Sequence, residues 1–518
     1  MYGRLRTQMV GFKPFKLLNV PSRPYKYSAF YNLQGGINTF KPSHEIKNNE
    51  LSDAYNVEYS TWGLKTRAGK EKYNATAIPS ATSIRGLHVS YATGSRFILC
   101  ADDLGEVWKD NGSGTLASVE AGYTADSHYC FHDWRTYTLW VNGTDELRRY
   151  DGSNIDTITA APDKMIGIIG VENRLFGWNG TDNNLYFCDL NDETTWDVAS
   201  EYSGFLIVPQ VKGDFIIACA RQGRSIIVFK GKSIWRYNLL GLPRNWTREL
   251  ISDSLGIAGR FALDTIQDVI FFMGDDAQVY QLANTIKLIS QNIDSPDTAR
   301  WGLSTDIANA KRSQSIVKYL SPKGVVRVVY NDVSATTDYP NMYADYYITR
   351  DAWLRGNMSA YNIAITDGKD DTGYMYIGDV AAGQIYKIDT DTSDDETAID
   401  AYFKTKDYDF GIVDVRKIFN SAYVSSRPVG TWNATITEYI DFASTGTDHN
   451  ISQSGGAAVW DTAIWDTDVW GGAGLVRSRI DLGNNAGYYA SYKVSCATLD
   501  KYFECRGLGI KYQLLEII

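Results

Sequence analysis

The chain has 518 residues, long enough for two or three domains, and its 35 Tyr, 14 Trp and 45 Gly against 12 Pro favour β-structure with many turns. Its net charge of −10 argues against a general nucleic-acid-binding protein. No apolar stretch reaches the ~18 residues of a membrane helix, so we expect no membrane span, and the apolar run near the N-terminus is too short for a signal peptide.

The N-terminal region differs in charge from the rest of the chain. Residues 1–44 contain no Asp or Glu and carry a charge of +7, so the remainder carries −17. We predict that residues 1–30 form a basic arm that docks on an acidic neighbour, and that residues 31–80 close the next domain or join the C-terminal one. A disordered, soluble tail is the alternative, although Phe12 and Leu18 are unusually apolar for one. The candidate partner-binding residues of the arm are Arg4, Arg6, Lys13, Lys16, Arg23 and Lys26.

A pattern then repeats along the middle of the chain. Each copy is an apolar strand, a turn rich in Gly, Asp or Asn, and a second strand, as in "RFILCADDLGEVW" and "DVIFFMGDDAQVYQL". The first five apolar anchors of these second strands lie 40, 38, 49 and 45 residues apart, which is the period of a four-stranded propeller blade. The anchors are Val107, Leu147, Leu185, Ile234, Val279 and Ile385.

The long interval between Val279 and Ile385 leaves room for one larger blade. We assign its four strands to "SIVKYL", "GVVRVVYND", "MYADYYIT" and "AWLRG". Segments with the 3.6-residue period of a helix are almost absent. The predicted fold is therefore all-β, with a six- or seven-bladed β-propeller over residues 81–397, a C-terminal antiparallel β-sandwich over residues 398–518, and an extended N-terminal arm.

The first repeat contains a turn motif that is known from other propellers. The stretch "ADDLGEVW", residues 101–108, resembles the Asp-box on the blades of sialidase-type β-propellers. Later copies lose parts of it, because Asp275 is followed by Ala277 where the glycine would stand, and Gly383 is preceded by Ala381 where the acid would stand. We interpret the acid and the glycine as turn chemistry, in which a carboxylate caps backbone N–H groups, and not as evidence of sialidase activity.

The C-terminal part follows an acidic, Ser/Thr-rich segment near residues 388–400, which we interpret as a linker. Its strands alternate without the 40-residue period, which is typical of a separate sandwich. It contains "VWDTAIWDTDVWGG", in which Trp460, Trp465 and Trp470 are five residues apart. Because this spacing fits neither one strand face nor one helix face, we predict a loop whose Trp side chains are buried or offered to a partner. Stacking on a sugar is the alternative.

Candidate catalytic and metal sites are few. "HYCFHD" places His128, Cys130 and His132 at alternate positions, but along a strand they would span about 13 Å at ~3.3 Å per residue, too far for one ion. The blades lack matching arginines, and no Ser/His/Asp elbow, phosphate-binding loop or Cys–His pair occurs. We predict no enzyme activity, no metal and no cofactor. The six scattered cysteines predict buried thiols made in a reducing cytoplasm and no disulfide frame.

Three stretches together resemble one family. Residues 32–69, "NLQGGINTFKPSHEIKNNELSDAYNVEYSTWGLKTRAG", resemble the opening of propeller proteins in the tails of short-tailed bacteriophages, namely the hub, nozzle or stabilisation proteins that close the packaged head. "LGIAGRFALDTIQDVIFFMGDDAQVYQL" resembles a recurrent blade of that group. The last strands, with Phe503, Gly507, Ile510 and Tyr512, resemble its close. The pattern covers most of the chain, and each motif alone is moderately specific.

The resemblance implies a structural virion protein. It implies a homo-oligomeric ring, a hexamer, below the portal and adaptor, which closes the DNA-filled head and forms part of the DNA-ejection channel. Its partners would be further copies of itself, the portal, the adaptor and other tail proteins, and its place would be the virion tail after synthesis in the host cytoplasm. DNA would pass without sequence-specific binding, which an acidic body suits because like charge weakens phosphate adhesion. The family has no catalytic residues.

Two alternatives to this function stay open. One is a tail fibre or other receptor-binding protein that recognises a glycan through the loop of three Trp residues. The other is a glycoside hydrolase built on a propeller.

Overall fold

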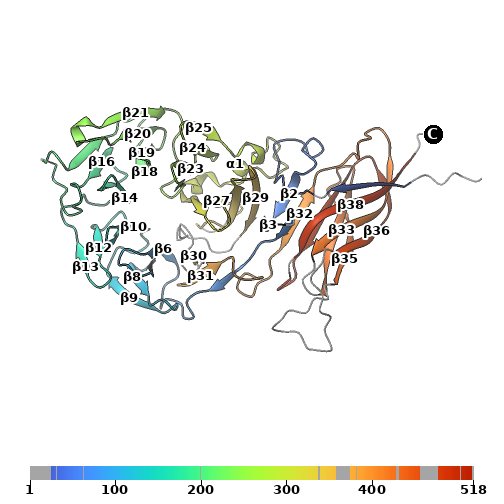
Figure 1. The fold of residues 1–518 in the computed structure, drawn as a ribbon, viewed down its shortest axis with the longest axis horizontal. Helices are drawn as coiled ribbons and strands as arrows, with labels where there is room; N and C mark the ends of the chain where they lie inside the picture. The colour runs from blue at the N-terminus through green and yellow to red at the C-terminus, as the bar shows by residue number, and fades with distance from the viewer. Residues whose placement is uncertain are drawn as a thin grey trace, which may run out of the picture.

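The computed structural model describes residues 25–30, 32–61, 63–198, 200–335, 339–357, 374–380, 382–427, 431–454, 476–501 and 503–515. Strands dominate these residues, and helical structure is limited to the short elements α1 (Leu303–Asp306), η1 (Pro243–Asn245), η2 (Gln291–Ile293) and η3 (Asn309–Gln314). The all-β prediction is confirmed. A ring of sheets lies at one end of the molecule and two larger sheets lie at the other (Figure 1).

The ring contains six four-stranded antiparallel sheets, each formed by four strands that are consecutive in the sequence. The first three sheets are β6 (Ile84–Ser90), β7 (Phe97–Asp102), β8 (Glu106–Asp110) and β9 (Leu116–Ala121); β10 (Cys130–Trp134), β11 (Tyr137–Val141), β12 (Arg148–Tyr150) and β13 (Ile155–Thr157); and β14 (Gly167–Val171), β15 (Arg174–Trp178), β16 (Asn184–Phe187) and β17 (Gly204–Ile207). The next three are β18 (Ile216–Gln222), β19 (Ser225–Lys230), β20 (Ile234–Asn238) and β21 (Thr247–Ser252); β22 (Leu263–Ile266), β23 (Val269–Met273), β24 (Val279–Leu282) and β25 (Ile286–Leu288); and β26 (Ile316–Leu320), β27 (Val325–Tyr330), β28 (Met342–Tyr347) and β29 (Ala352–Asn357). This arrangement confirms a β-propeller.

The first strands of successive sheets pack side by side around the centre of the ring. β6 lies next to β10, β10 next to β14, β14 next to β18, β18 next to β22 and β22 next to β26. Apolar side chains fill the space between neighbouring sheets, as in the cluster that joins Leu139 of the second sheet to Leu175 of the third. Each sheet therefore buries its faces against its two neighbours, which explains strands that are apolar on both faces.

The six apolar anchors occupy equivalent positions in the ring. Five of them lie in the strand that follows the hairpin turn, namely β8, β16, β20, β24 and β31 (Ile385–Ile388), and the sixth directly precedes β12. None is more than 1% exposed; the anchors are Val107, Leu147, Leu185, Ile234, Val279 and Ile385. The predicted register of the repeat is confirmed, and so are the four strands assigned to the larger blade, which are β26 to β29.

A further sheet combines strands from the two ends of the ring. Its order is β30 (Met375–Gly378), β31 and β5 (Lys70–Lys72), and β5 pairs antiparallel with β31. β5 therefore occupies the place that the fourth strand takes after the third in the other sheets. The N-terminal segment supplies this strand, so the part of the chain that precedes the ring is hydrogen-bonded to the last strand of the ring, β31.

The C-terminal part consists of two antiparallel sheets, and each includes strands from the N-terminal segment. One has the order β3 (Val57–Tyr59), β4 (Leu64–Thr66), β38 (Glu504–Leu514), β33 (Lys417–Arg427) and β36 (Val476–Gly487), with β1 (Lys26–Phe30) also paired to β38. The other has the order β2 (Leu51–Tyr55), β32 (Ala401–Thr405), β37 (Ala490–Cys496), β34 (Thr431–Ile440) and β35 (Thr447–Ser454). Buried side chains of both sheets, among them Phe403, Ile436 and Leu508, belong to one apolar core.

The predicted arm and Trp loop lie largely outside the described residues. This applies to Arg4, Arg6, Lys13, Lys16 and Arg23, and to Trp460, Trp465 and Trp470. Lys26 is exposed at the start of β1, opposite Tyr512 of β38. The predicted boundary of the arm at residue 30 requires correction, because β1 belongs to a C-terminal sheet. The physical reason is apolar packing, since the Phe30 ring stacks on Tyr408 with 3.8 Å between the ring centroids.

Candidate functional site

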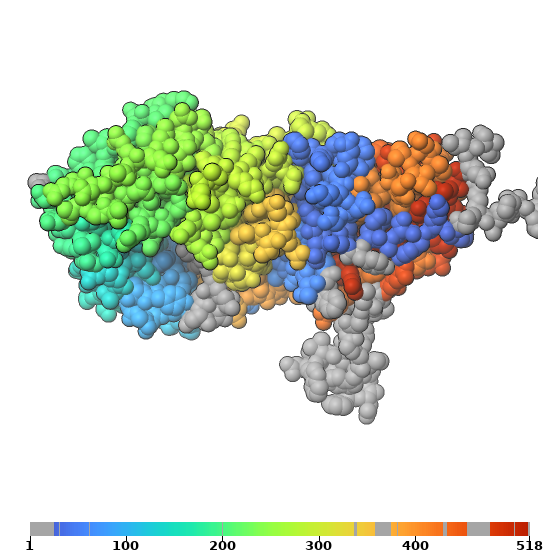
Figure 2. Space-filling model, turned by 45° about the horizontal axis from the view of Figure 1, so that its top comes forward, coloured from blue at the N-terminus to red at the C-terminus, as the bar shows by residue number. Residues whose placement is uncertain are grey.

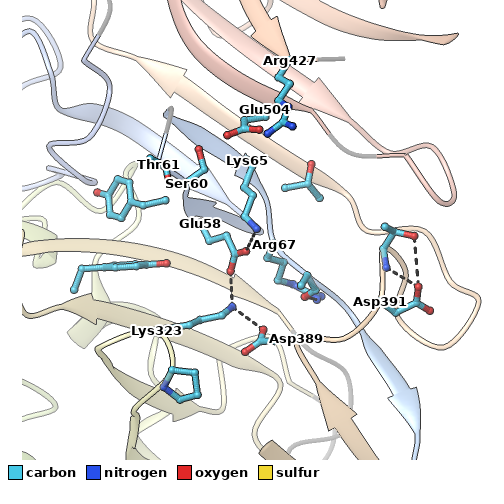
Figure 3. A pocket seen from close by; sticks show the side chains of 16 residues that line it. Glu58, Ser60, Thr61, Lys65, Arg67, Lys323, Asp389, Asp391, Arg427 and Glu504 are labelled. Atoms are coloured by element: carbon cyan, nitrogen blue, oxygen red, sulfur yellow. Dashed lines mark hydrogen bonds and ion pairs between the residues drawn. The ribbon is translucent and has the colours of Figure 1, made fainter. Parts of the chain in front are cut away.

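A cavity of about 740 Å³ lies where the propeller meets the C-terminal sheets (Figure 3). Three parts of the chain contribute charged side chains to it. Glu58 and Lys65 come from β3 and β4, Lys323 comes from the turn between β26 and β27, and Asp389 directly follows β31. The cavity is thus formed by segments that are far apart in the sequence.

These charged groups form a connected cluster. Glu58 accepts hydrogen bonds from Lys323 and forms an ion pair with Lys65 at 2.9 Å, and the Lys323 ammonium lies 2.6 Å from Asp389. Burial alone would raise the pKa of Glu58, but the charges of Lys323 and Lys65 lower it to about 2. The Glu58 carboxylate is therefore ionised at neutral pH and held between two cations, which is unsuited to proton transfer near neutral pH.

Arg67 makes a second set of contacts in the region where the propeller meets the C-terminal sheets, which we call the junction. Its side chain is 2% exposed, and its Nη1 donates to Asp394 Oδ1 at 2.8 Å. The same guanidinium donates to Asn56 Oδ1 at 3.0 Å and to the carbonyl oxygen of Asn357 at 2.9 Å. The acidic segment near residues 388–400, which was expected to be a linker, connects β31 to β32, and Lys323 and Arg67 bind its Asp389 and Asp394 to the folded body.

The segment that carries the family resemblance lies at this junction. Gly36 has φ +78, and a Cβ there would lie 2.8 Å from the Trp353 backbone nitrogen, so glycine is required by both conformation and space. Asp53 pairs with Arg355 of β29 at 3.0 Å, which links β2 to the propeller. The N-terminal residues form a band between the propeller and the C-terminal sheets (Figure 2). Residues 31–80 were expected to close the propeller or to join the C-terminal domain; β5 of this segment pairs with β31, and β2, β3 and β4 belong to the C-terminal sheets.

The centre of the propeller contains a second site. A cavity of about 710 Å³ is lined mainly by residues in or just before the first strands of the sheets, including Arg85, His128 and Arg260. A smaller cavity of about 340 Å³ also includes Arg260 and continues along β10, β14 and β18. Sequence reasoning missed this site, because its residues come from different repeats and share no local motif.

The two cavities at the centre of the propeller, which we call the channel, are lined at different points by His128, Cys130 and His132. His128 lines the larger cavity, whereas Cys130 and His132 lie on β10 and line the smaller one. His132 Nε2 accepts a hydrogen bond from the Gly170 backbone N–H at 2.9 Å, which links β10 to β14. Among the described residues, no group of three His, Cys, Asp or Glu side chains is arranged to hold a metal ion. All six cysteines are free, and five of them are buried, as predicted.

The Asp-box turn is built differently from the prediction in one respect. Asp102 caps the turn, because its carboxylate accepts from the backbone N–H groups of Leu104 and Glu106 and from Trp108 Nε1. Asp103 instead accepts from the backbone N–H groups of Thr82 and Ser83, just before β6. The interpretation as turn chemistry is confirmed, but the acid at the Asp-box position, Asp103, fixes the segment before β6, and its neighbour Asp102 caps the turn.

The same cross-link recurs in other sheets of the propeller. Asp145 accepts from the Thr124 backbone N–H before β10, at 2.9 Å. Asp275 accepts from the Gly256 backbone N–H before β22, at 3.0 Å. A carboxylate in the hairpin turn thus repeatedly fixes the entry to the first strand of its own sheet, which is a structural role.

Comparison with known proteins found matches among solved structures alone. No family model matches this chain, and no curated protein matches it. Among solved structures, the RRP9 WD40 repeats are 9% identical, with 62% of this chain and 99% of that chain covered and a TM-score of 0.39. The Cps50 (Swd1) β-propeller domain of Myceliophteria thermophila is also 9% identical, with the same coverage and a TM-score of 0.42.

A third similar structure is a larger protein. PorZ, a bacterial surface component of the type-IX secretion system of Porphyromonas gingivalis, is 11% identical, with a TM-score of 0.38. The match covers 64% of this chain and 42% of PorZ, so it spans less than half of that protein. At such identities and scores, these likenesses carry no argument about function.

No helix of the described residues is both long and apolar enough to cross a membrane.

Proposed function

We propose that this chain is a non-catalytic structural subunit of a bacteriophage tail, a hub or nozzle protein that forms a ring below the portal and adaptor. The observation that carries the proposal is the junction described above. The segment that resembles tail hub proteins, residues 32–69, supplies strands to both C-terminal sheets and leads directly into β5 of the propeller.

Strands and ion pairs shared between the propeller and the C-terminal sheets suit a subunit whose two parts must keep a fixed relative orientation. Arg67 with Asp394, Arg355 with Asp53, and Lys323 with Glu58 are charged contacts between the propeller side and the N-terminal or C-terminal strands. Buried or half-buried ion pairs of this kind add little net stability. They hold the two parts in one orientation, because moving the partners of a pair apart would leave a buried charge without its counter-ion. A fixed angle between two domains is needed when several copies must close into one ring.

We also infer the finer architecture from the sheets. The seven radial sheets would be the blades of one seven-bladed propeller, closed by β5, and the two C-terminal sheets would be the halves of one sandwich. A propeller offers a rigid rim and two faces for contact with neighbours. We propose that the partners are further copies, six in all, together with the portal, the adaptor and other tail proteins.

The absence of enzyme activity is part of the proposal. It is supported by Glu58 and Asp389, two carboxylates that line the junction cavity, because both are held by lysines. A glycosidase needs two carboxyl groups of different pKa facing one substrate space. In this cavity, Glu58 and Asp389 serve as counter-ions.

The test is assembly of the purified full chain, alone and with the portal and adaptor proteins of the same phage. Light scattering and negative-stain images should show rings of six copies, at least on the portal–adaptor complex. The double variant Arg67→Ala/Asp394→Ala should remain able to bind but form irregular or open assemblies. A chain that stays monomeric with both partners present would contradict the proposal. Turnover of a glycoside, or binding on a glycan array, would instead favour the hydrolase or the receptor-binding protein.

A further inference from the structure

The larger cavity in the propeller channel has the size and walls of a ligand site. Its volume of about 710 Å³ lies within the range of ~300–1,000 Å³ that is usual for small-molecule pockets. Its walls are largely apolar, with Ile166, Ile216, Phe261 and Pro340 drawn from different sheets or the loops between them. An apolar wall with a few polar groups is the composition that holds a small organic molecule in one orientation.

The charges that face the channel differ in sign from the chain as a whole. The two channel cavities are lined by four cations, Arg85, Arg221, Arg260 and Lys318, against the two carboxylates Asp126 and Asp264. The whole chain carries −10. Because the walls of the larger cavity are mostly apolar, the local excess of positive charge acts on a ligand more strongly than it would at the open surface.

Arg260 is central to this excess of charge, because it lines both cavities. Its Nη2 donates to the backbone carbonyl oxygen of His128 at 3.0 Å. Within the described residues, no carboxylate lies within 4.0 Å of its guanidinium. Burial lowers the pKa of Arg260 to about 10, so the group keeps its charge at neutral pH. A half-buried cation without an acidic partner is costly to the fold, which is typical of a site that meets its anion from outside.

Two further groups complete the polar side of the site. Arg85 pairs at 2.8 Å with Asp126, whose side chain is 75% exposed, and its buried Nε has no hydrogen-bond partner. His128 Nδ1 is also buried and without a partner. Burial and the neighbouring charges of Arg260 and Arg85 lower the pKa of His128 to about 4, so at neutral pH its ring is an uncharged polar group.

We propose that this channel cavity binds a small organic carboxylate, an anion on an apolar or aromatic body. Its carboxylate takes the place of the missing counter-ion of Arg260, with Arg85 beside it. Its apolar body lies against Ile166, Ile216 and Phe261. The inference is independent of the proposed role in a tail, because it concerns one propeller and needs no ring.

The experiment uses the full chain and three probes, followed by calorimetry or ligand-observed NMR. The probes are 3-phenylpropionate, its uncharged amide and inorganic phosphate. We expect 3-phenylpropionate to bind at least tenfold more tightly than the amide and than phosphate. Equal binding of the amide would overturn the role of charge, and equal or tighter binding of phosphate would overturn the role of the apolar walls.

Variants separate the site from the rest of the surface. Arg260→Met and Arg85→Met should each weaken binding of 3-phenylpropionate by at least tenfold, and Arg260→Met should not lower the melting temperature of the free protein. Arg224→Met is the matched control, because Arg224 is 74% exposed and paired with Glu172, and it should leave binding unchanged. Unchanged binding in the folded Arg85 and Arg260 variants would overturn the proposal. Should Arg260→Met fail to fold, Arg85→Met and the comparison of acid with amide decide the question.

Discussion

At the scale of single residues, the two aspartates of the first hairpin turn have different structural roles. Asp102 is fully buried and caps its own turn with two backbone contacts and the Trp108 indole, whereas Asp103 is half-buried and holds the segment before β6. Sequence patterns placed a capping carboxylate in this turn. They could not tell which of two adjacent acids points into the fold, because that depends on the register between β7 and β8.

We predict that Asp102→Ala destabilises the protein more than Asp103→Ala. Each lost hydrogen bond costs roughly 1 kcal/mol, and a buried donor left without an acceptor adds to that cost. We expect about 2–3 kcal/mol for Asp102→Ala and about 1 kcal/mol for Asp103→Ala, measured by denaturant unfolding. A larger loss in Asp103→Ala would show that the cross-link to Thr82 and Ser83 dominates.

Glu438 gives the protein a specific pH dependence. It is buried in β34, where Asn485 donates to it at 2.7 Å, and burial raises its pKa from 4.5 to about 7. Because the folded pKa lies above the unfolded one, folding favours the protonated form. The contribution of this group to stability is therefore full below about pH 4.5, falls between pH 4.5 and 7, and changes little above pH 7.

We predict that Glu438→Gln abolishes the fall in stability between pH 4.5 and 7, so that the variant is more stable than the parent protein at pH 8. By linkage, the difference between the two proteins should grow by about 3 kcal/mol from pH 4.5 to pH 8. Thermal unfolding at a series of pH values measures it. Glu249→Gln on β21, where Glu249 is 61% exposed, is the control and should follow the parent curve. Parallel curves for Glu438→Gln and the parent would contradict the prediction.

At the scale of elements, the repeat is held by the strand that follows each hairpin turn. Its anchor packs between neighbouring sheets, so truncation leaves a cavity that the rigid ring cannot easily close. We predict that Leu185→Ala costs about 2–5 kcal/mol of unfolding free energy. Leu240→Ala, in the exposed loop before β21 where Leu240 is 69% exposed, should cost little. Similar losses for the two variants would show that the third strands are not the core of the ring.

At the scale of the whole molecule, β1 sets the limit of any N-terminal arm. We predict that a chain lacking residues 1–24 keeps the melting transition of the full chain but no longer joins the portal–adaptor complex. The reason is that β1 and its contact between Phe30 and Tyr408 remain in place. Removal of residues 1–30 should lower the melting temperature as well. Melting curves and co-sedimentation measure both effects, and binding of the parent should weaken with added salt.

Two outcomes would contradict this division of roles. Normal assembly of the chain that lacks residues 1–24 would show that the basic residues such as Arg4 and Lys13 are not a docking arm. An equal loss of stability in both truncated chains would show that β1 adds nothing to the C-terminal sheet.

The sequence by itself determined the repeating units of this protein. An apolar anchor such as Val107 or Val279, preceded by a strand and a turn, is a local pattern, and local patterns report secondary structure and hairpins because neighbouring residues form them. Burial of all six anchors and the four strands β26 to β29 agree with that pattern. The buried free thiols are likewise visible in the apolar runs that surround them.

The way in which the units are joined depends on tertiary contacts. The pairing of β5 with β31, the contact of Arg67 with Asp394 and the presence of Arg85 and Arg260 in the wall of one cavity all involve residues far apart in the chain. No periodicity records such contacts, because each partner alone looks like an ordinary charged or strand residue. The sequence therefore predicted a linker near residues 388–400 but not the contacts of Lys323 and Arg67 with its Asp389 and Asp394.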